Sequence, residues 1–200
     1  MRLITIHGIG RTGPNYAGPL FASLRSRGRD FVATPIWWEP LDISGIRWWP
    51  LPAEWVADLW LSWSWVFRKR REKILQLIRE AVEDGHNAVV VAHSHGTWLA
   101  IQALRGGPTL PLFVSLGRTS HRFGGLLFPG HHEIRARTWL NIYSTSDPLS
   151  GRIPEDHLSD VGVVRNLPLP LAHSAYWHST LVTSAISLFW PSPTGVSNEA

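Results

Sequence analysis

Short runs of apolar residues alternate with amphipathic stretches along the 200-residue chain. Residues 88–92 read Ala-Val-Val-Val-Ala, and a continuous β-branched run of this kind is typical of a parallel strand buried on both faces. The same pattern predicts four further strands and a short edge strand late in the chain. The four runs are residues 3–6, 30–36, 112–116 and 138–143, and the edge strand is 161–164.

Apolar residues recur at helical spacing between these runs. Leu20, Phe21 and Leu24 are expected to point inward from a helix over residues 15–27. A second periodic segment predicts a helix that runs to about Asp84, with Gly85 as its stop. Because strands alternate with helices, we expect an α/β fold with a mostly parallel central sheet and helices on both faces. The other predicted helices are 97–104 and 176–190.

The composition is that of a globular protein, with 44% hydrophobic and 17% charged residues. We expect a single domain over residues 1–200, with a flexible tail from 191 to 200. The absence of cysteine excludes disulfides, zinc–thiolate sites and a cysteine nucleophile. The net charge is +4, but no nucleic-acid-binding motif accompanies it, so no nucleic-acid partner is expected. With no signal peptide or long apolar run, we expect a cytoplasmic protein; its oligomeric state stays open.

Tryptophan is concentrated in one part of the chain, residues 37–71, which we expect to form a lid-like insertion that is helical from residue 53 onward. Its last four residues, 68–71, are Arg-Lys-Arg-Arg. One interpretation is a lid that makes peripheral contact with a membrane, since tryptophans favour the interface and cations favour anionic headgroups. The other is a hydrophobic helix that covers the sheet, with the cations solvated at its C-terminal end.

The pentapeptide Ala-His-Ser-His-Gly at residues 92–96 carries the most chemical information, because it lies between a predicted strand and a predicted helix. A sharp strand-to-helix turn forces its middle residue, Ser94, into a strained and exposed backbone conformation. The positions two before and two after it must be small, and Ala92 and Gly96 meet this need. The alternative is an ordinary connection in which Ser94 caps the helix.

This segment resembles the nucleophile elbow of the α/β-hydrolase superfamily, with Ala92 in place of the commoner first glycine. Further matches run from His7-Gly8 to Tyr176-Trp177 and so cover nearly the whole chain. The sequence is similar in particular to compact esterase- and lipase-like members that lack a large cap domain. The resemblance implies an α/β-hydrolase fold in which the nucleophile, the acid and the histidine follow one another along the chain.

An acid is expected at the end of the strand predicted at 138–143, because such sheets collect functional groups at the carboxyl ends of their strands. Asp147 lies there, directly before Pro148. The resemblance implies that Asp147 orients the catalytic imidazole and stabilises the imidazolium. Alternatively the Asp-Pro pair forms only a turn, and then Asp156 or Asp160 is the acid.

A base is expected just before the last helix, where His173 follows a proline-rich loop. The resemblance implies that His173 takes the proton of Ser94 and returns it to the leaving group. His178 is the competing candidate, although a histidine within a helix is more often a surface or capping residue.

By the same resemblance, the amides of Ile9 and His95 form the oxyanion hole. Gly8 and Gly10 permit a close approach of the backbone, although a turn that needs glycine only for its shape has the same pattern. No third glycine stands in register, so the segment is not a dinucleotide-binding fingerprint. The expected substrate-binding residues are His7, Gly8, Arg11 and His93.

A metal site could be imagined from His93, His95, His131 and His132. His-x-His is a weak signal by itself, and Ser94 between the first two already has an explanation. We therefore expect no metal and no cofactor.

The sequence thus predicts a serine hydrolase that cleaves small-molecule or lipid carboxylic esters through an acyl-enzyme intermediate. Two alternatives stay open. One is a catalytically inactive α/β-hydrolase-fold protein that binds a membrane or a partner through its Trp-rich surface. The other is an acyltransferase that uses the same triad.

Overall fold

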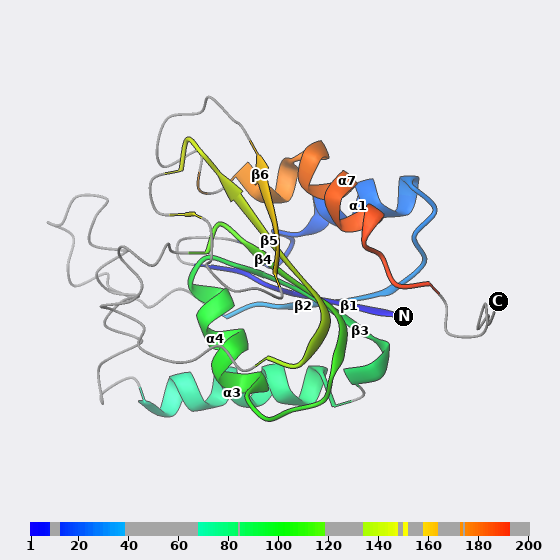
Figure 1. Ribbon diagram of the computed structural model, residues 1–200. Helices are drawn as coiled ribbons and strands as arrows, with labels where there is room; N and C mark the ends of the chain where they lie inside the picture. Colours follow the sequence, from blue (N-terminus) through cyan, green and yellow to red (C-terminus); the bar gives the residue numbers. More distant parts are fainter. Residues whose placement is uncertain are drawn as a thin grey trace, which may run out of the picture.

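Six strands form one sheet at the centre of the protein, as the computed structural model shows (Figure 1). The order across the sheet is β2-β1-β3-β4-β5-β6, and every neighbouring pair is parallel. All six predicted strands are present, and the strand expected at the edge of the sheet is β6. The strands are β1 (Arg2–Ile6), β2 (Val32–Ile36), β3 (Ala88–His93), β4 (Leu110–Leu116), β5 (Ala136–Ser144) and β6 (Leu158–Val163).

The structure describes residues 1–8, 13–38, 68–83, 85–118, 134–147, 150–151, 158–163, 173 and 175–192. Most of the Trp-rich segment (39–67) and the expected tail from residue 193 lie outside these ranges. The basic residues 68–71 belong to the helix α3. No helix in the described ranges is long and apolar enough to cross a bilayer.

Helices cover both faces of the sheet, as the alternation of elements predicted (Figure 1). One face carries α1 (Gly18–Ser26) and α7 (Thr180–Leu188), and the other carries α3 (Arg68–Ala81) and α4 (His95–Leu104). Two short 3-10 helices, η2 (Gly85–Asn87) and η3 (Ala175–His178), complete the set of described helices.

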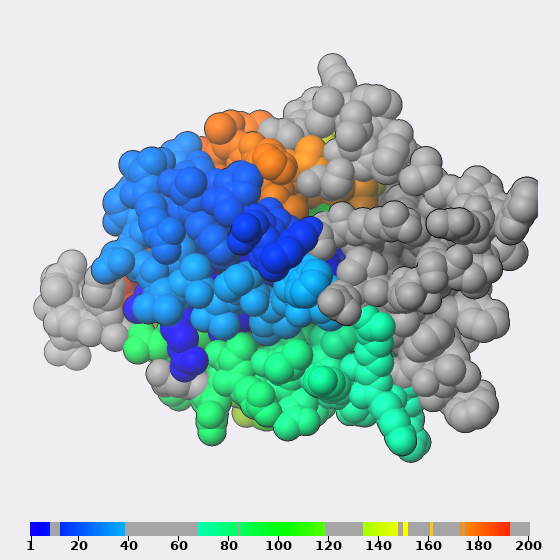
Figure 2. Space-filling model, turned by 180° about the vertical axis from the view of Figure 1, so that it is seen from behind, coloured from blue at the N-terminus to red at the C-terminus, as the bar shows by residue number. Residues whose placement is uncertain are grey.

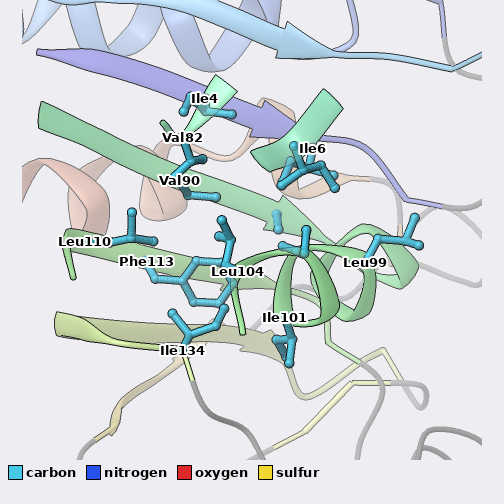
Figure 3. Packing of buried hydrophobic residues seen from close by; sticks show 14 of the residues in the cluster. Ile4, Ile6, Val82, Val90, Leu99, Ile101, Leu104, Leu110, Phe113 and Ile134 are labelled. Atoms are coloured by element: carbon cyan, nitrogen blue, oxygen red, sulfur yellow. The ribbon is translucent and has the colours of Figure 1, made fainter. Parts of the chain in front are cut away.

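The central strand β3 is apolar from Ala88 to Ala92 because it is buried on both faces of the sheet. All six of its residues are buried. Successive side chains alternate between the faces, so Val89 and Val91 join the cluster under α1 and α7, whereas Val90 joins the cluster under α3 and α4. Figure 3 shows Val90 beside Ile4 and Phe113 in the second of these clusters, which α4 covers.

Helices α1 and α7 lie side by side, and Figure 2 shows residues of the α1 region in blue next to those of the α7 region in orange. Arg29, beyond the end of α1, donates from Nε to Ser187 Oγ at 3.0 Å. Nη2 of Arg29 donates to the carbonyl oxygen of Ser187 at 2.7 Å. These bonds tie the N-terminal third of the chain to the last helix.

Two helices begin later than their apolar periodicity predicted, so those boundaries were wrong. The first helix starts at Gly18 because Pro19 favours the first turn, and residues 14–17 form turns instead. The last helix starts at Thr180, since the side chain of Ser179 accepts a hydrogen bond from the Val182 amide and caps it. Phe21 is partly buried at the edge of the core, whereas Leu20 and Leu24 are fully buried.

Helix α3 ends at Ala81, before the predicted stop at Gly85. The amide of Val82 donates to the carbonyls of both Ile78 and Arg79, which tightens the last turn and ends the α-helical pattern. Glycine is instead required at position 85 for packing, because a Cβ there would overlap the ring of Pro108.

The strand order reverses between β1 and β3. The chain runs from β1 outward to β2 and then crosses to β3 on the other side of β1. In open α/β sheets, ligands bind beyond the carboxyl ends of the strands at such a switch point. His7 and Gly8 follow the end of β1 there, and Ser94 follows the end of β3.

The backbones of these two segments lie in close contact. A Cβ on Gly96, at the start of α4, would overlap the carbonyl oxygen of His7. A Cβ on Gly8 would lie 2.7 Å from Cβ of Ser94 and 2.8 Å from the His93 carbonyl oxygen. Glycine at both positions therefore lets β1 and the turn after β3 approach each other.

We expect Gly96→Ala to lower the free energy of unfolding by about 1–3 kcal/mol, because backbone atoms must move to admit the methyl group. Gly18→Ala is the control, since no atom lies within 4 Å of a Cβ built there. It is expected to be neutral or to stabilise by up to about 1 kcal/mol. Urea denaturation measures both, and equal stabilities for the two variants would contradict the predicted contact.

Candidate active site

Ser94 occupies a strained turn between β3 and α4. Its φ is 52° and its ψ is −125°, and among the described residues no other non-glycine residue has a positive φ. Such a conformation is costly for a residue with a side chain and persists only where its surroundings enforce it. The Ser94 amide donates to the Leu116 carbonyl at 2.9 Å, and Thr97 Oγ1 donates to the Ala92 carbonyl at 3.0 Å. These bonds hold the predicted sharp turn.

The side chain of Ser94 does not cap helix α4. It stands at the N-cap position but makes no capping hydrogen bond. Its Oγ instead lies 2.7 Å from Nε2 of His173, a residue 79 positions along the chain. Helix capping therefore does not explain this serine.

A chain of short hydrogen bonds joins Ser94, His173 and Asp147. Nδ1 of His173 lies 2.7 Å from Oδ2 of Asp147, and its Nε2 lies 2.7 Å from Ser94 Oγ. An ionised carboxylate can only accept, so the proton belongs on Nδ1, and Nε2 of the neutral ring accepts from the serine hydroxyl. All three residues are buried, with exposed fractions of 4% for Ser94, 8% for His173 and 1% for Asp147.

Asp147 lies just beyond β5 in a backbone turn, in which its amide donates to Ser144 and its carbonyl accepts from Ser150. The carboxylate oxygen Oδ2 of Asp147 accepts from His173. Of the alternative acids, Asp156 lies outside the described residues and Asp160 lies in β6.

The two candidate bases differ in their surroundings. His173 is buried and bonded to both Ser94 and Asp147, whereas His178 is exposed at the end of η3. Of these two histidines, His173 is the one that lies beside Ser94, and its role as the base stays a prediction.

Solved structures with a similar arrangement cover most of this chain. A protein from Xanthomonas campestris pv. campestris assigned to the α/β superfamily of hydrolases is 17% identical, with a TM-score of 0.51 and coverage of 94% of each chain. Esterase PE8 is 15% identical, with a TM-score of 0.55, over 94% of this chain and 89% of that one. The RedJ thioesterase of prodiginine biosynthesis in Streptomyces coelicolor is 13% identical, with a TM-score of 0.53, over 94% and 85%.

The chain has the α/β-hydrolase fold. No protein-family model matches the sequence, and no curated protein matches it. The structural likeness extends along nearly the whole chain, as the resemblance in the sequence implied.

In this α/β-hydrolase-fold protein, two predicted substrate-binding histidines bond to the protein's own backbone. Nε2 of His93 donates to the His173 carbonyl at 2.7 Å. Nδ1 of His7 donates to the Gly8 carbonyl at 2.6 Å, and its Nε2 accepts from the Trp38 amide at 3.2 Å. The His7 ring also packs on Trp38, with ring centroids 3.7 Å apart. Contact of these residues with substrate stays a prediction.

Of the two residues expected to form the oxyanion hole, His95 lies within the described residues and Ile9 lies outside them. His95 is the first residue of α4, so its amide lies at the positive end of a ten-residue helix beside Ser94. Ile9, Gly10 and Arg11 lie outside the described residues. The assignment of Ile9 and His95 to the oxyanion hole, and of Arg11 to substrate, stays a prediction.

No group of three or more histidine, aspartate or glutamate side chains in the described ranges is arranged to hold a metal ion. Of the histidines weighed as ligands, His131 and His132 lie outside those ranges. His93 Nε2 is engaged by the His173 carbonyl, and the His95 ring stacks on Trp98 with centroids 5.4 Å apart.

One residue of the site carried no signal for this role in the sequence. The Tyr176 hydroxyl donates to Oδ2 of Asp147 at 3.0 Å and accepts from the Ser144 amide at 3.0 Å. An aromatic residue at the start of an apolar helical segment predicts only a core position. The contact depends on how the end of β5 meets the segment after His173.

Burial keeps the other histidines around Ser94 neutral. Desolvation lowers the pKa of His7 from 6.5 to about 4. Desolvation, reinforced by the neighbouring His173, lowers the pKa of His93 to about 3. The pKa of His95 also falls to about 3, again through desolvation and then through the proximity of His7. These imidazoles resist protonation because the protein cannot solvate their charge.

We expect the free energy of unfolding to fall as the pH decreases from about 6.5 toward about 4. In this window, unfolded histidines bind protons and these three folded ones do not, so the unfolded state is favoured by acid. A histidine that is protonated only in the unfolded state changes the free energy of unfolding by about 1.4 kcal/mol per pH unit. The three histidines together therefore give a slope of at most about 4 kcal/mol per pH unit.

Urea denaturation at a series of pH values measures this slope. His95→Gln removes one of the three histidines that bind a proton only on unfolding, so we expect it to reduce the slope by about a third. His178→Gln removes an exposed imidazole and is the matched control. A slope in His95→Gln equal to that of the control would refute the linkage.

Proposed function

We propose that this α/β-hydrolase-fold protein is a serine hydrolase that cleaves carboxylic esters through an acyl-enzyme intermediate. The observation that carries the proposal is the buried hydrogen-bonded chain from Ser94 Oγ through His173 to Asp147. It lies on a strained strand-to-helix turn at the switch point of a parallel sheet, where this fold holds its nucleophile.

In the acylation step, Ser94 Oγ attacks the ester carbonyl carbon while His173 Nε2 takes the hydroxyl proton. The bond from that carbon to the leaving oxygen then breaks, and His173 returns the proton to the departing alcohol. Water next attacks the acyl-enzyme and gives a proton to His173. The bond between the acyl carbon and Ser94 Oγ breaks, and the proton returns to the serine. Asp147 stays ionised and stabilises the imidazolium throughout.

The negative charge that develops on the carbonyl oxygen needs donors beside Ser94. The amide of His95 and the N-terminus of α4 stand on that side, and the Ile9 amide is the expected second donor. Structural neighbours include an esterase, a thioesterase and a carboxylesterase from Bacillus cereus, and their names favour ester-type substrates.

We expect a fluorophosphonate to label the wild-type protein at one site and to leave Ser94→Ala unlabelled, because the alanine variant has no nucleophilic oxygen at that site. The variant should also lose about a thousandfold or more in kcat on a short-chain p-nitrophenyl ester. Ser184→Ala, which removes an exposed hydroxyl on α7, is the control and should retain both properties. An unlabelled wild type, or equal labelling of Ser94→Ala, would reject the assignment.

Asp147→Asn is expected to lower kcat by about 10³- to 10⁴-fold with little change in KM. The amide keeps the shape of the carboxyl group but favours the wrong imidazole tautomer and leaves the imidazolium unstabilised. His178→Gln is the comparison variant, and its kinetics should match the wild type. Steady-state kinetics on the same ester measure both, and a kcat within a few-fold of wild type for Asp147→Asn would remove Asp147 from the mechanism.

A further inference from the structure

The hydroxyl of Tyr176 lies at the centre of a buried polar cluster around the proposed acid. It donates to Asp147 Oδ2 at 3.0 Å, accepts from the Ser144 amide at 3.0 Å and lies 3.0 Å from Ser150 Oγ. An amide N–H can only donate and an ionised carboxylate can only accept, so the single phenolic proton is directed to Asp147. Tyr176 itself is only 3% exposed.

The oxygen that Tyr176 bonds is the one that His173 uses. Oδ2 of Asp147 accepts from His173 Nδ1 at 2.7 Å and from the tyrosine hydroxyl at 3.0 Å. With two donors on one oxygen, the carboxyl group cannot rotate away from the imidazole without losing a second hydrogen bond. The tyrosine therefore adds a second fixed donor to the carboxylate oxygen that faces the imidazole.

The tyrosine ring is held by elements on several sides. Gly117, just after β4, has a φ of +55°, and a Cβ there would lie 2.6 Å from the ring carbon Cε2 of Tyr176. The ring centroid lies 5.5 Å from that of His93 and 6.5 Å from that of His173, edge-on to the latter. Burial, and then the charge of Asp147, raise the pKa of Tyr176, so the hydroxyl keeps its proton and remains a donor. The ends of β4 and β5 therefore fix where this donor points.

We propose that Tyr176 is a positioning residue: it holds the Asp147 carboxylate and, through it, the imidazole of His173, without touching the substrate. This inference rests on the proposed hydrolase function and deepens it. Tyr176 thereby links the acid loop after β5 to the segment that carries the base.

The first experiment compares Tyr176→Phe with Tyr16→Phe. Tyr16 is half-buried, and its hydroxyl bonds to Thr5 Oγ1 at 3.0 Å and to the Ile36 carbonyl at 3.2 Å, so each variant removes a hydrogen-bonded phenolic hydroxyl. For Tyr176→Phe we expect kcat on p-nitrophenyl acetate and the rate of fluorophosphonate labelling to fall about tenfold to a hundredfold, with KM within about twofold. Tyr16→Phe should stay within about twofold of wild type in each, measured where both variants are folded by circular dichroism.

A double-mutant cycle tests whether Tyr176 acts through the acid. In an Asp147→Asn background, Tyr176→Phe should cost less than about twofold in labelling rate, because the carboxylate that it holds is already gone. The same fold-loss in both backgrounds would show that the tyrosine acts elsewhere and would overturn the proposal.

A spectroscopic measurement separates this inference from the proposed function, because it needs no turnover. The imidazole N–H bonded to Asp147 should give a low-field proton resonance in wild type and in Tyr16→Phe. In Tyr176→Phe the resonance should move or broaden as the carboxylate becomes mobile. A wild type that shows the resonance but resists labelling would reject the hydrolase function alone. A labelled wild type whose resonance and rates are the same in both tyrosine variants would reject the role of Tyr176 alone.

If Tyr176→Phe does not fold, Ser150→Ala provides the test, since it keeps the tyrosine and removes one of its hydroxyl partners. We expect a several-fold fall in kcat with unchanged KM. An unchanged kcat in this variant would overturn the proposal.

Discussion

The close approach of two strand ends at the centre of the sheet is the constraint on which the rest of the site depends. Gly8 and Gly96 allow the end of β1 to contact the turn that follows β3. That turn holds Ser94 at a φ of 52°, a conformation that its hydrogen bonds to neighbouring backbone enforce. On this constrained backbone, Ser94 Oγ lies 2.7 Å from Nε2 of His173.

Desolvation is the second physical feature of this site. Asp147 is 1% exposed, and burial of its carboxylate charge is costly unless hydrogen bonds compensate for it. His173 and Tyr176 both donate to its Oδ2. The imidazole of His93 is buried as the neutral form, so it adds a hydrogen bond to the backbone of His173 without adding a second charge. The same low dielectric would strengthen the interactions that stabilise a transition state.

Much of the architecture could be predicted because it is encoded locally. The six strands were predicted from runs rich in apolar residues, and the parallel order was predicted from the helices expected between the first four of them. Helix boundaries were less predictable, because the spacing of apolar residues carries no information about the proline in the first turn of α1 or about the cap that Ser179 provides for α7. The choice of Ser94, His173 and Asp147 came from the turn and from the resemblance, and the structure brings these three side chains together.

The sequence alone therefore determined the strands, the strained turn and the order of the three candidate residues, because each depends on neighbours within a few positions or on a recognisable motif. The tertiary structure decided how the buried polar groups are paired. Nε2 of His7 accepts from the Trp38 amide, Nε2 of His93 donates to the His173 carbonyl, and Tyr176 becomes the second donor to Asp147. Such pairings join residues far apart in the chain, and they exist only where the carboxyl ends of separate strands converge.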